Sequence, residues 1–305
     1  MTNVYILTGF LGAGKTTILN NLLESLKHQK NIVIENEFGE TSIDGQLVNK
    51  NIESLFDLNN GCICCSLENE LFDVLNQIAT SKILPDNLFI ETTGIADVGE
   101  VISLFKTEVV KSKFELKKTI CVVDSETIED RICEVAEAVR QIVMSDCIIL
   151  NKIGLITKEY LVSVHKLISD INSTTTLITT EDGKIDEAIL NEEKEQAKFK
   201  FKLQYPIKGR ELKHSIKTIT YKTQNEFDIL ELEFTMRLIL QVNREQIFRI
   251  KGFIKDTHSQ NKLLVQSAGK RLVIETFGEW EEEHPTSYLV FIGKDITDKA
   301  IERIL

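Results

Sequence analysis

Three of the six cysteines of this 305-residue chain lie within four positions, in the segment GCICC at residues 61–65. Thiolate sulfur selects Zn²⁺ or Cu⁺ among the available metals, so Cys62, Cys64 and Cys65 are candidate metal ligands. Three sulfurs are one short of a closed structural zinc site, which leaves a position open for exchange. A redox pair and three buried side chains are the alternatives. Zinc is the first choice of metal, ahead of other thiophilic or transition metals.

A second segment, GFLGAGKTT at residues 9–17, follows an apolar run and precedes a helix-like pattern. It fits the phosphate-binding pattern G-x-x-x-x-G-K-[ST], in which glycines let the backbone turn tightly and direct N–H groups at phosphate oxygens. In this pattern the lysine contacts the β- and γ-phosphates, and the hydroxyl of the next residue binds Mg²⁺. The sequence predicts a nucleoside triphosphate site made of Gly9, Gly12, Ala13, Gly14, Lys15, Thr16 and Thr17.

Hydrolysis needs further groups, and FIETTG at residues 89–94 can supply two of them. We expect the Glu91 carboxylate to contact Mg²⁺, directly or through water, and the Gly94 N–H to contact the γ-phosphate. Asp124, at the end of VVD, is a second candidate acid. Ile95 cannot orient a water molecule as the glutamine of Ras-type enzymes does. We therefore expect slow intrinsic hydrolysis.

The elements that must position these residues are visible as six apolar runs that alternate with helix-like patterns over residues 1–190. The predicted strands are NVYIL, NIVIE, NLFIE, KTICVVD, DCIIL and TTLIT. This alternation is typical of a parallel sheet with crossover helices. The predicted fold class is α/β, a P-loop NTPase domain with a mainly parallel sheet flanked by helices.

The composition and the pattern of the sequence change after this domain. Residues 191–213 are strongly charged and are predicted to form a linker. Residues 214–305 contain one helix-like segment and several strand-like segments, and they end on a further helix. This pattern predicts a small α+β domain.

The composition limits the partners. A net charge of −11 and a pI near 5.1 argue against nucleic acids and anionic membranes as partners. The chain has no apolar run approaching the roughly 18 residues of a membrane span and no signal peptide pattern at MTNVYILTGFLG. We expect a cytoplasmic protein, in which clustered cysteines are more often ligands than disulfides. The scattered Cys121, Cys133 and Cys147 are predicted to be small core residues.

Four segments, GFLGAGKTT, ENEFGETSID, GCICCSL and ETTGIAD, occur here in order and closely resemble those of the CobW-type P-loop GTPases. REQIFRIKGFI and SYLVFIGKDI resemble the small second domain of that family, so the resemblance covers nearly the whole chain. It implies a GTP-driven metallochaperone or metal insertase with a client metalloprotein as its partner. It also implies switch loops at residues 35–44 and 91–94, and a metal site at Cys62, Cys64 and Cys65 with Glu37 as an extra oxygen ligand.

The guanine-recognition motif departs from the family pattern N-K-x-D, because Asn151 and Lys152 are followed by Gly154 in place of the aspartate. Losing a hydrogen-bonding partner costs about 1–3 kcal/mol, which is about one or two powers of ten in affinity. Asn151 and Lys152 can still support the loop and stack on the base, and a neighbouring acid could substitute. GTP remains the first choice of nucleotide, with ATP or relaxed specificity as the alternative.

Two hypotheses from different classes follow. In the first, the chain is a nucleotide-gated metallochaperone that hydrolyses slowly and hands metal to a client. In the second, it is a nucleotide-switched assembly or maturation factor that does not deliver metal. A P-loop kinase acting on a small molecule is disfavoured, because it leaves the switch-like segments unexplained. The sequence leaves a homodimer open.

Overall fold

The computed structural model of the chain describes most of its length. The described residues are 1–35, 54–57, 67–81, 84–92, 98–134, 136–191, 216–242, 246–259, 261–268, 271–280, 285–303 and 305. They form two compact units, the first starting at Met1 and the second ending at Leu305. The domain boundaries, 1–190, 191–213 and 214–305, stay a prediction, because residues 192–215 lie outside the described ranges.

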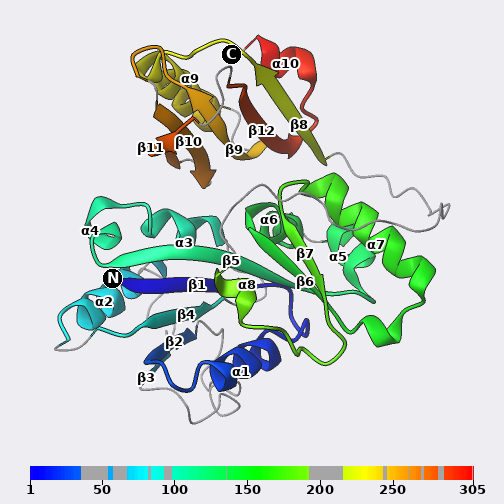
Figure 1. The fold of residues 1–305 in the computed structure, drawn as a ribbon. Helices are drawn as coiled ribbons and strands as arrows, with labels where there is room; N and C mark the ends of the chain where they lie inside the picture. The colour runs from blue at the N-terminus through cyan, green and yellow to red at the C-terminus, as the bar shows by residue number, and fades with distance from the viewer. Residues whose placement is uncertain are drawn as a thin grey trace. The chain divides into compact units, whose positions relative to one another are not determined.

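Seven strands among the described residues of the first unit form one parallel sheet in the order β3-β2-β4-β1-β5-β6-β7 (Figure 1). The strands are β1 (Thr2–Thr8), β2 (Asn31–Glu35), β3 (Ser54–Asp57), β4 (Asn87–Glu91), β5 (Phe114–Asp124), β6 (Cys147–Asn151) and β7 (Thr176–Thr179). The residues of β2, β4 and β6 are buried throughout, as expected for parallel strands with both faces covered. The predicted fold class is confirmed. Sequence analysis missed β3, in which only Leu55 and Phe56 are apolar and Asp57 is of a type that is depleted in strands.

Helices cover both faces of this sheet, and Figure 1 shows α1 and α3 on opposite sides of it. Side chains of α1, among them Ile18 and Leu22, form a buried cluster with Leu7 and Phe89 of the central strands. This packing holds the start of α1 at the carboxyl edge of the sheet. The described helices of this unit are α1 (Lys15–Ser25), α2 (Leu67–Ala79), α3 (Val98–Leu104), α4 (Glu108–Lys111), α5 (Ile128–Glu134), α6 (Ala136–Met144), the 3₁₀ turn η2 (Ile153–Leu155), α7 (Lys158–Ile171) and α8 (Ala188–Asn191).

The second unit contains a five-stranded antiparallel sheet in the order β11-β10-β9-β12-β8, counted over its described residues. Its elements are β8 (Ile216–Thr223), α9 (Ile229–Val242), β9 (Ile247–Lys255), β10 (Asn261–Ala268), β11 (Arg271–Glu279), β12 (Ser287–Lys294) and α10 (Asp298–Glu302). Met236 and Leu240 of α9 share a buried cluster with Ile250 and Phe291 of the sheet. The small α+β architecture is confirmed. None of the described helices of the chain is long and apolar enough to cross a membrane.

Candidate functional site

The turn between β1 and α1 has the backbone geometry of a phosphate-binding loop. Gly9, Gly12 and Gly14 have φ angles of 140°, 76° and 98°, which residues with a side chain rarely adopt. Gly14 lies directly before the first turn of α1, where the N–H groups lack partners within the helix and can bind an anion. Thr17 is exposed on that turn. The loop therefore presents backbone donors at the carboxyl edge of the sheet.

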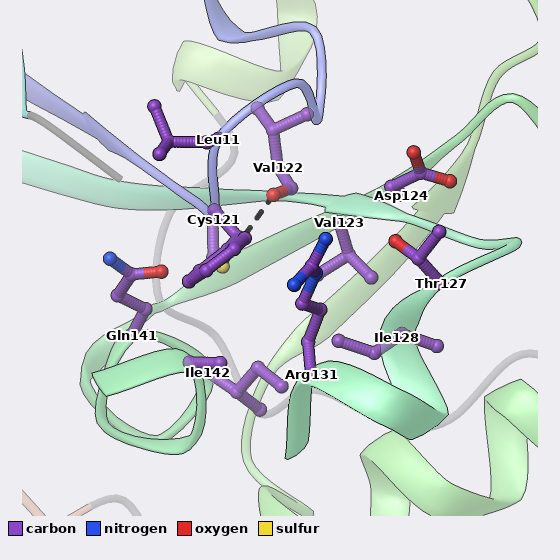
Figure 2. A pocket seen from close by; sticks show the side chains of 12 residues that line it. Leu11, Cys121, Val122, Val123, Asp124, Thr127, Ile128, Arg131, Gln141 and Ile142 are labelled. Atoms are coloured by element: carbon purple, nitrogen blue, oxygen red, sulfur yellow. Dashed lines mark hydrogen bonds between the residues drawn. The ribbon is translucent and has the colours of Figure 1, made fainter. Parts of the chain in front are cut away.

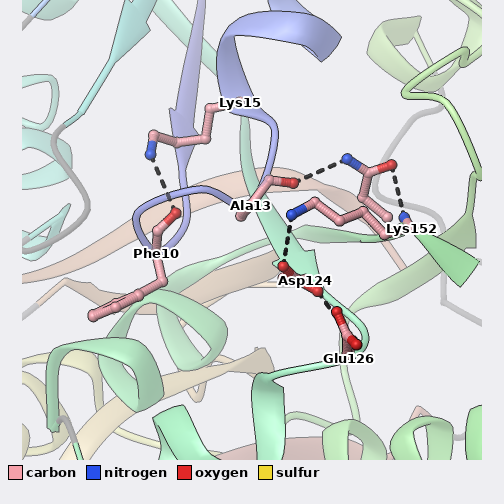
Figure 3. Close-up of polar contacts among 7 residues, drawn as sticks. Phe10, Ala13, Lys15, Asp124, Glu126 and Lys152 are labelled. Atoms are coloured by element: carbon pink, nitrogen blue, oxygen red, sulfur yellow. Dashed lines mark hydrogen bonds and ion pairs between the residues drawn. The ribbon is translucent and has the colours of Figure 1, made fainter. Parts of the chain in front are cut away.

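Lys15 folds back onto this loop. Its Nζ donates to the carbonyl oxygen of Phe10 at 3.4 Å (Figure 3). The same Nζ donates to the carbonyl oxygen of Gly9 at 3.0 Å, and only 8% of the residue is exposed. A carbonyl oxygen and a phosphate oxygen are both acceptors, so the ammonium can exchange one for the other when a nucleotide binds. The positive charge is thus held beside the backbone donors of the loop.

Thr16 and Glu91 meet although 75 positions separate them in the chain. The Thr16 hydroxyl donates to Glu91 Oε1 at 2.9 Å, and Glu91 ends β4 in register with Leu7 of β1. Carboxylate and other hard oxygen ligands suit Mg²⁺, so this pair fits the predicted magnesium site. When bound there with a nucleotide, Mg²⁺ would neutralise charge that develops on the phosphates.

Removing the Thr16 hydroxyl is expected to weaken Mg²⁺ binding in the presence of nucleotide. For Thr16→Ala, we expect the Mg²⁺ concentration for half-maximal hydrolysis to rise about 10- to 100-fold, the usual cost of disturbing a metal site. A magnesium titration of GTP hydrolysis measures this. Thr80→Ala, which removes an exposed threonine hydroxyl at the end of α2, is the control. An unchanged magnesium requirement in Thr16→Ala would contradict the assignment.

A carboxylate that sequence analysis did not assign as a ligand lies beside Glu91. Glu35 ends β2, is 2% exposed, and is in register with Glu91 of β4 and with Asp57 of β3. Three acids therefore end three adjacent strands at one edge of the sheet. The resemblance put residue 35 at the start of a switch loop, whereas here it is the last residue of a strand. The only signal in the sequence was the acid that closes NIVIE, and its meaning depends on the strand order.

Asn151 is the last residue of β6 and Lys152 follows it. Asn151 Nδ2 donates to the Ala13 carbonyl oxygen at 2.9 Å, and its Oδ1 accepts from the Lys152 N–H at 2.9 Å. Lys152 Nζ forms an ion pair with Asp124 Oδ2 at 2.8 Å. The second candidate acid thus pairs with a lysine of the base-recognition motif, and it lies in register with Asn151 at the edge of the sheet.

A small hollow beside the phosphate-binding loop is lined by side chains of β5, α5 and α6 (Figure 2). Arg131 of α5 lies over the ring of Phe10, with its Cζ 4.7 Å from the ring centroid. This distance allows a cation–π contact. Ile128 and Ile142 line the same hollow. Phe10 is thus anchored on the side of the loop that faces α5, which helps to fix the loop that carries Lys15.

The predicted transition-metal ligands fall outside the described residues. They are Cys62, Cys64, Cys65 and Glu37, and Gly94 of the second predicted switch lies outside as well. In the part of the chain that is described, no group of three or more His, Cys, Asp and Glu side chains could hold a metal ion.

The remaining cysteines were predicted to be core residues, and this is wrong for one of them. Cys121 and Cys147 are buried, whereas Cys133 on α5 is exposed. Burial raises the pKa of the Cys121 thiol to about 12, which disfavours the thiolate that metal binding requires. The apolar Ile132 beside Cys133 in the sequence is only partly exposed, whereas Cys133 faces solvent, and this misled the prediction.

Comparisons with known proteins cover both units. Residues 3–179 match the family model of the CobW/HypB/UreG nucleotide-binding domain, and residues 216–305 match that of the cobalamin synthesis protein CobW C-terminal domain. The chain is 32% identical to the zinc chaperone YjiA of Escherichia coli, over 98% of this chain and 96% of YjiA. It is 28% identical to the zinc chaperone CobW of Pseudomonas aeruginosa, over 98% of this chain and 89% of that protein.

Solved structures of YjiA are similar over the whole chain. The crystal structure of the Zn(II)-bound YjiA GTPase has a TM-score of 0.74 at 28% identity and covers 99% of this chain and 97% of YjiA. A Zn(II)-bound YjiA variant, in which one glutamate and two adjacent cysteines are replaced by alanine, has a TM-score of 0.73 with the same identity and coverage. In YjiA that glutamate lies 29 positions before the first of the two cysteines.

Proposed function

Because the chain belongs to the CobW family, with a CobW/HypB/UreG nucleotide-binding domain followed by a CobW C-terminal domain, we propose that it is a GTP-gated zinc metallochaperone. As a member of this family it is a P-loop GTPase. In the proposal, slow GTP hydrolysis in the first domain is coupled to the transfer of zinc to a client metalloprotein. The names of two full-length relatives, both zinc chaperones, support zinc as the cargo.

The hydrogen bond from the Thr16 hydroxyl to the Glu91 carboxylate is the observation that carries the proposal. It joins the phosphate-binding loop to Glu91, which ends β4 and is the first residue of the predicted second switch at residues 91–94. A Mg²⁺·GTP complex that engages Thr16 and Glu91 would therefore act directly on the strand end that leads to this switch. We propose Mg²⁺ as the cofactor and GTP as the nucleotide, with ATP as the alternative.

The zinc ligands are proposed to be Cys62, Cys64 and Cys65 with one carboxylate. The sequence prediction for that carboxylate is Glu37. In the YjiA variant the replaced glutamate lies 29 positions before the first of the two adjacent cysteines. The residue 29 positions before Cys64 in this chain is Glu35. Glu35 ends β2 beside Glu91, one strand away from the magnesium pair. We therefore propose Glu35 as a second candidate for the oxygen ligand, in a position that could connect the zinc and magnesium sites.

Replacing Cys64 and Cys65 together with alanine is expected to weaken Zn²⁺ binding about 100-fold or more, because two of three sulfur ligands are lost. GTP affinity without zinc should be unchanged, because these residues lie outside the phosphate-binding loop. The matched control is Cys133→Ala, which removes an exposed thiol from α5. Competition with a chromogenic zinc chelator measures the zinc affinity, and calorimetry measures the GTP affinity. Equal zinc affinity in the double variant and the control would contradict the proposed site.

Gating needs its own measurement. The zinc-loaded protein should release zinc to a chelator at different rates when it holds GTP and when it holds GDP. If zinc changes neither nucleotide affinity nor hydrolysis, the two sites are uncoupled and the gated mechanism is wrong. If a client is still activated by the double cysteine variant, delivery is wrong and the assembly-factor hypothesis stands.

A further inference from the structure

An acidic side chain from a distant loop lies over Gly154. Gly154 belongs to the turn η2 after Lys152, and Glu181 belongs to the loop between β7 and α8. A Cβ added to Gly154 would lie 2.2 Å from Glu181 Oε1, 2.8 Å from its Cδ and 3.1 Å from its Cγ. The carboxylate of Glu181 therefore occupies the space in which a side chain at position 154 would begin.

The backbone on both sides of Glu181 is fixed to the elements that form the base-recognition motif and the phosphate-binding helix. Thr180 N–H donates to the Leu150 carbonyl oxygen at 2.8 Å, and the Thr180 carbonyl oxygen accepts from Ile153 N–H at 3.4 Å. Asn21 of α1 donates to the Gly183 carbonyl oxygen at 2.8 Å. Glu181 is thus held by a short loop with a contact to each of these elements.

The Glu181 carboxylate is available to a ligand. Glu181 is exposed, and no other residue that the structure describes forms a hydrogen bond or ion pair with its side chain. Lys152, the lysine of the neighbouring motif, pairs with Asp124 instead (Figure 3). Both oxygens of Glu181 can therefore accept hydrogen bonds from a bound molecule.

We propose that Glu181 recognises the guanine base, in place of the aspartate that the N-K-x-D motif would carry at position 154. The proposal rests on the proposed function, because it names the residue that selects the nucleotide. Guanine offers two neighbouring donors, N1–H and the 2-amino group, and a carboxylate can accept both in a paired arrangement. Adenine has an acceptor at N1 and no 2-amino group, so it would present a lone pair to the same carboxylate.

Gly154 then has a role of its own. An aspartate at this position and Glu181 would compete for one place, and the two like charges would repel each other. Because Gly154 has no side chain, the space beside it is left to the longer side chain of Glu181. The acid is therefore supplied from a different part of the chain, and the base-recognition motif can keep its guanine preference without its usual last residue.

Nucleotide analogues test the proposal directly, with affinities for GDP, ADP, IDP and XDP measured by calorimetry in the presence of Mg²⁺. The wild type should prefer GDP over ADP, and also over IDP, which lacks the 2-amino group. Glu181→Ala should lose about 10- to 100-fold in GDP affinity, as expected for an unpaired polar partner, and bind GDP and IDP equally. Glu181→Gln should gain affinity for XDP, because an amide N–H₂ can donate to the C2 carbonyl of xanthine.

Two further variants separate recognition from structure. Asp182→Asn removes a charge from the adjacent exposed position of the same loop and should leave the GDP preference intact. Gly154→Asp combined with Glu181→Ala should restore the preference by returning the acid to the motif. Unchanged ADP affinity in every variant shows that the fold and the phosphate site persist.

The outcomes are distinct. The proposal is wrong if the preference for GDP survives in both Glu181→Ala and Glu181→Gln. It is also wrong if the preference for GDP is lost in Asp182→Asn. A wild type that binds GDP and ADP equally also overturns it, while the P-loop NTPase would stand. A wild type that binds no nucleotide overturns the proposed function itself, and with it the role of Glu181.

Discussion

GTP hydrolysis is expected to fall about 100- to 1,000-fold when Lys15 is replaced with alanine, the usual cost of losing one preorganised donor to a transition state. In this structure the Lys15 ammonium is almost fully buried and is held by the carbonyl oxygens of Gly9 and Phe10. It can therefore reach bound phosphates without a large rearrangement. In the loose transition state of phosphoryl transfer, negative charge spreads over the phosphoryl oxygens, and a fixed ammonium stabilises it.

Single-turnover hydrolysis with saturating GTP measures this loss and separates it from weaker binding. Lys27→Ala is the control, because Lys27 lies just beyond the end of α1 and its ammonium forms an exposed ion pair with Glu24 at 3.1 Å. The Lys27 variant should hydrolyse GTP at the wild-type rate. Equal rates in the Lys15 and Lys27 variants would show that hydrolysis does not use the phosphate-binding loop.

Replacing Gly9 with alanine is expected to destabilise the first domain by about 4 kcal/mol. Overpacking costs about 1–3 kcal/mol, an unfavourable φ costs about 1–3 kcal/mol, and the two costs add. A Cβ at Gly9 would lie 2.1 Å from the Val122 carbonyl oxygen, closer than real side chains come, and 3.0 and 3.1 Å from the carbonyl carbon and the nitrogen of Val122. Val122 is part of β5, a buried strand that cannot move aside. The φ of 140° adds strain of its own.

Gly12 gives a matched comparison within the same loop. Its φ of 76° is also in the left-handed region, but a Cβ there would meet no atom within 4 Å. Gly12→Ala should therefore cost only the backbone term, about 1 kcal/mol. At roughly 2–4 °C per kcal/mol, the melting temperatures of the two variants should differ by about 6–12 °C. Calorimetric melting measures the difference, and equal melting temperatures would mean that the loop does not touch β5 in solution.

The sequence predicted the elements with long signals and missed the contacts between distant segments. Six strands were visible as apolar runs, and the phosphate-binding loop was visible in its spacing. β3 was missed because Ser54 and Asp57, on either side of its two apolar residues, are not strand-forming types, whereas the equally short β7 is flanked by threonines. Glu35 and Glu181 could not be assigned, because the first acquires its neighbours from the order of the strands and the second from the course of a loop.

The partner of Asp124 also could not be predicted from the sequence. It was a second candidate for the magnesium acid because it ends an apolar run, as Glu91 does. Its strand instead lies beside β6, so its carboxylate pairs with Lys152. Two acids in the same local context thus have different partners, and only the order of strands in the sheet separates them.

The position of β1 in the sheet also bears on how the protein is made. β1 is synthesised before its two neighbours, β4 and β5, which begin at Asn87 and Phe114. One edge of this buried strand therefore stays unpaired until more than a quarter of the chain has been made, and the other until more than a third has been made. Such sequence-distant parallel pairing slows folding and leaves an unpaired strand open to association with other chains. The phosphate-binding loop that follows β1 is therefore made well before the strands that hold β1 in the sheet.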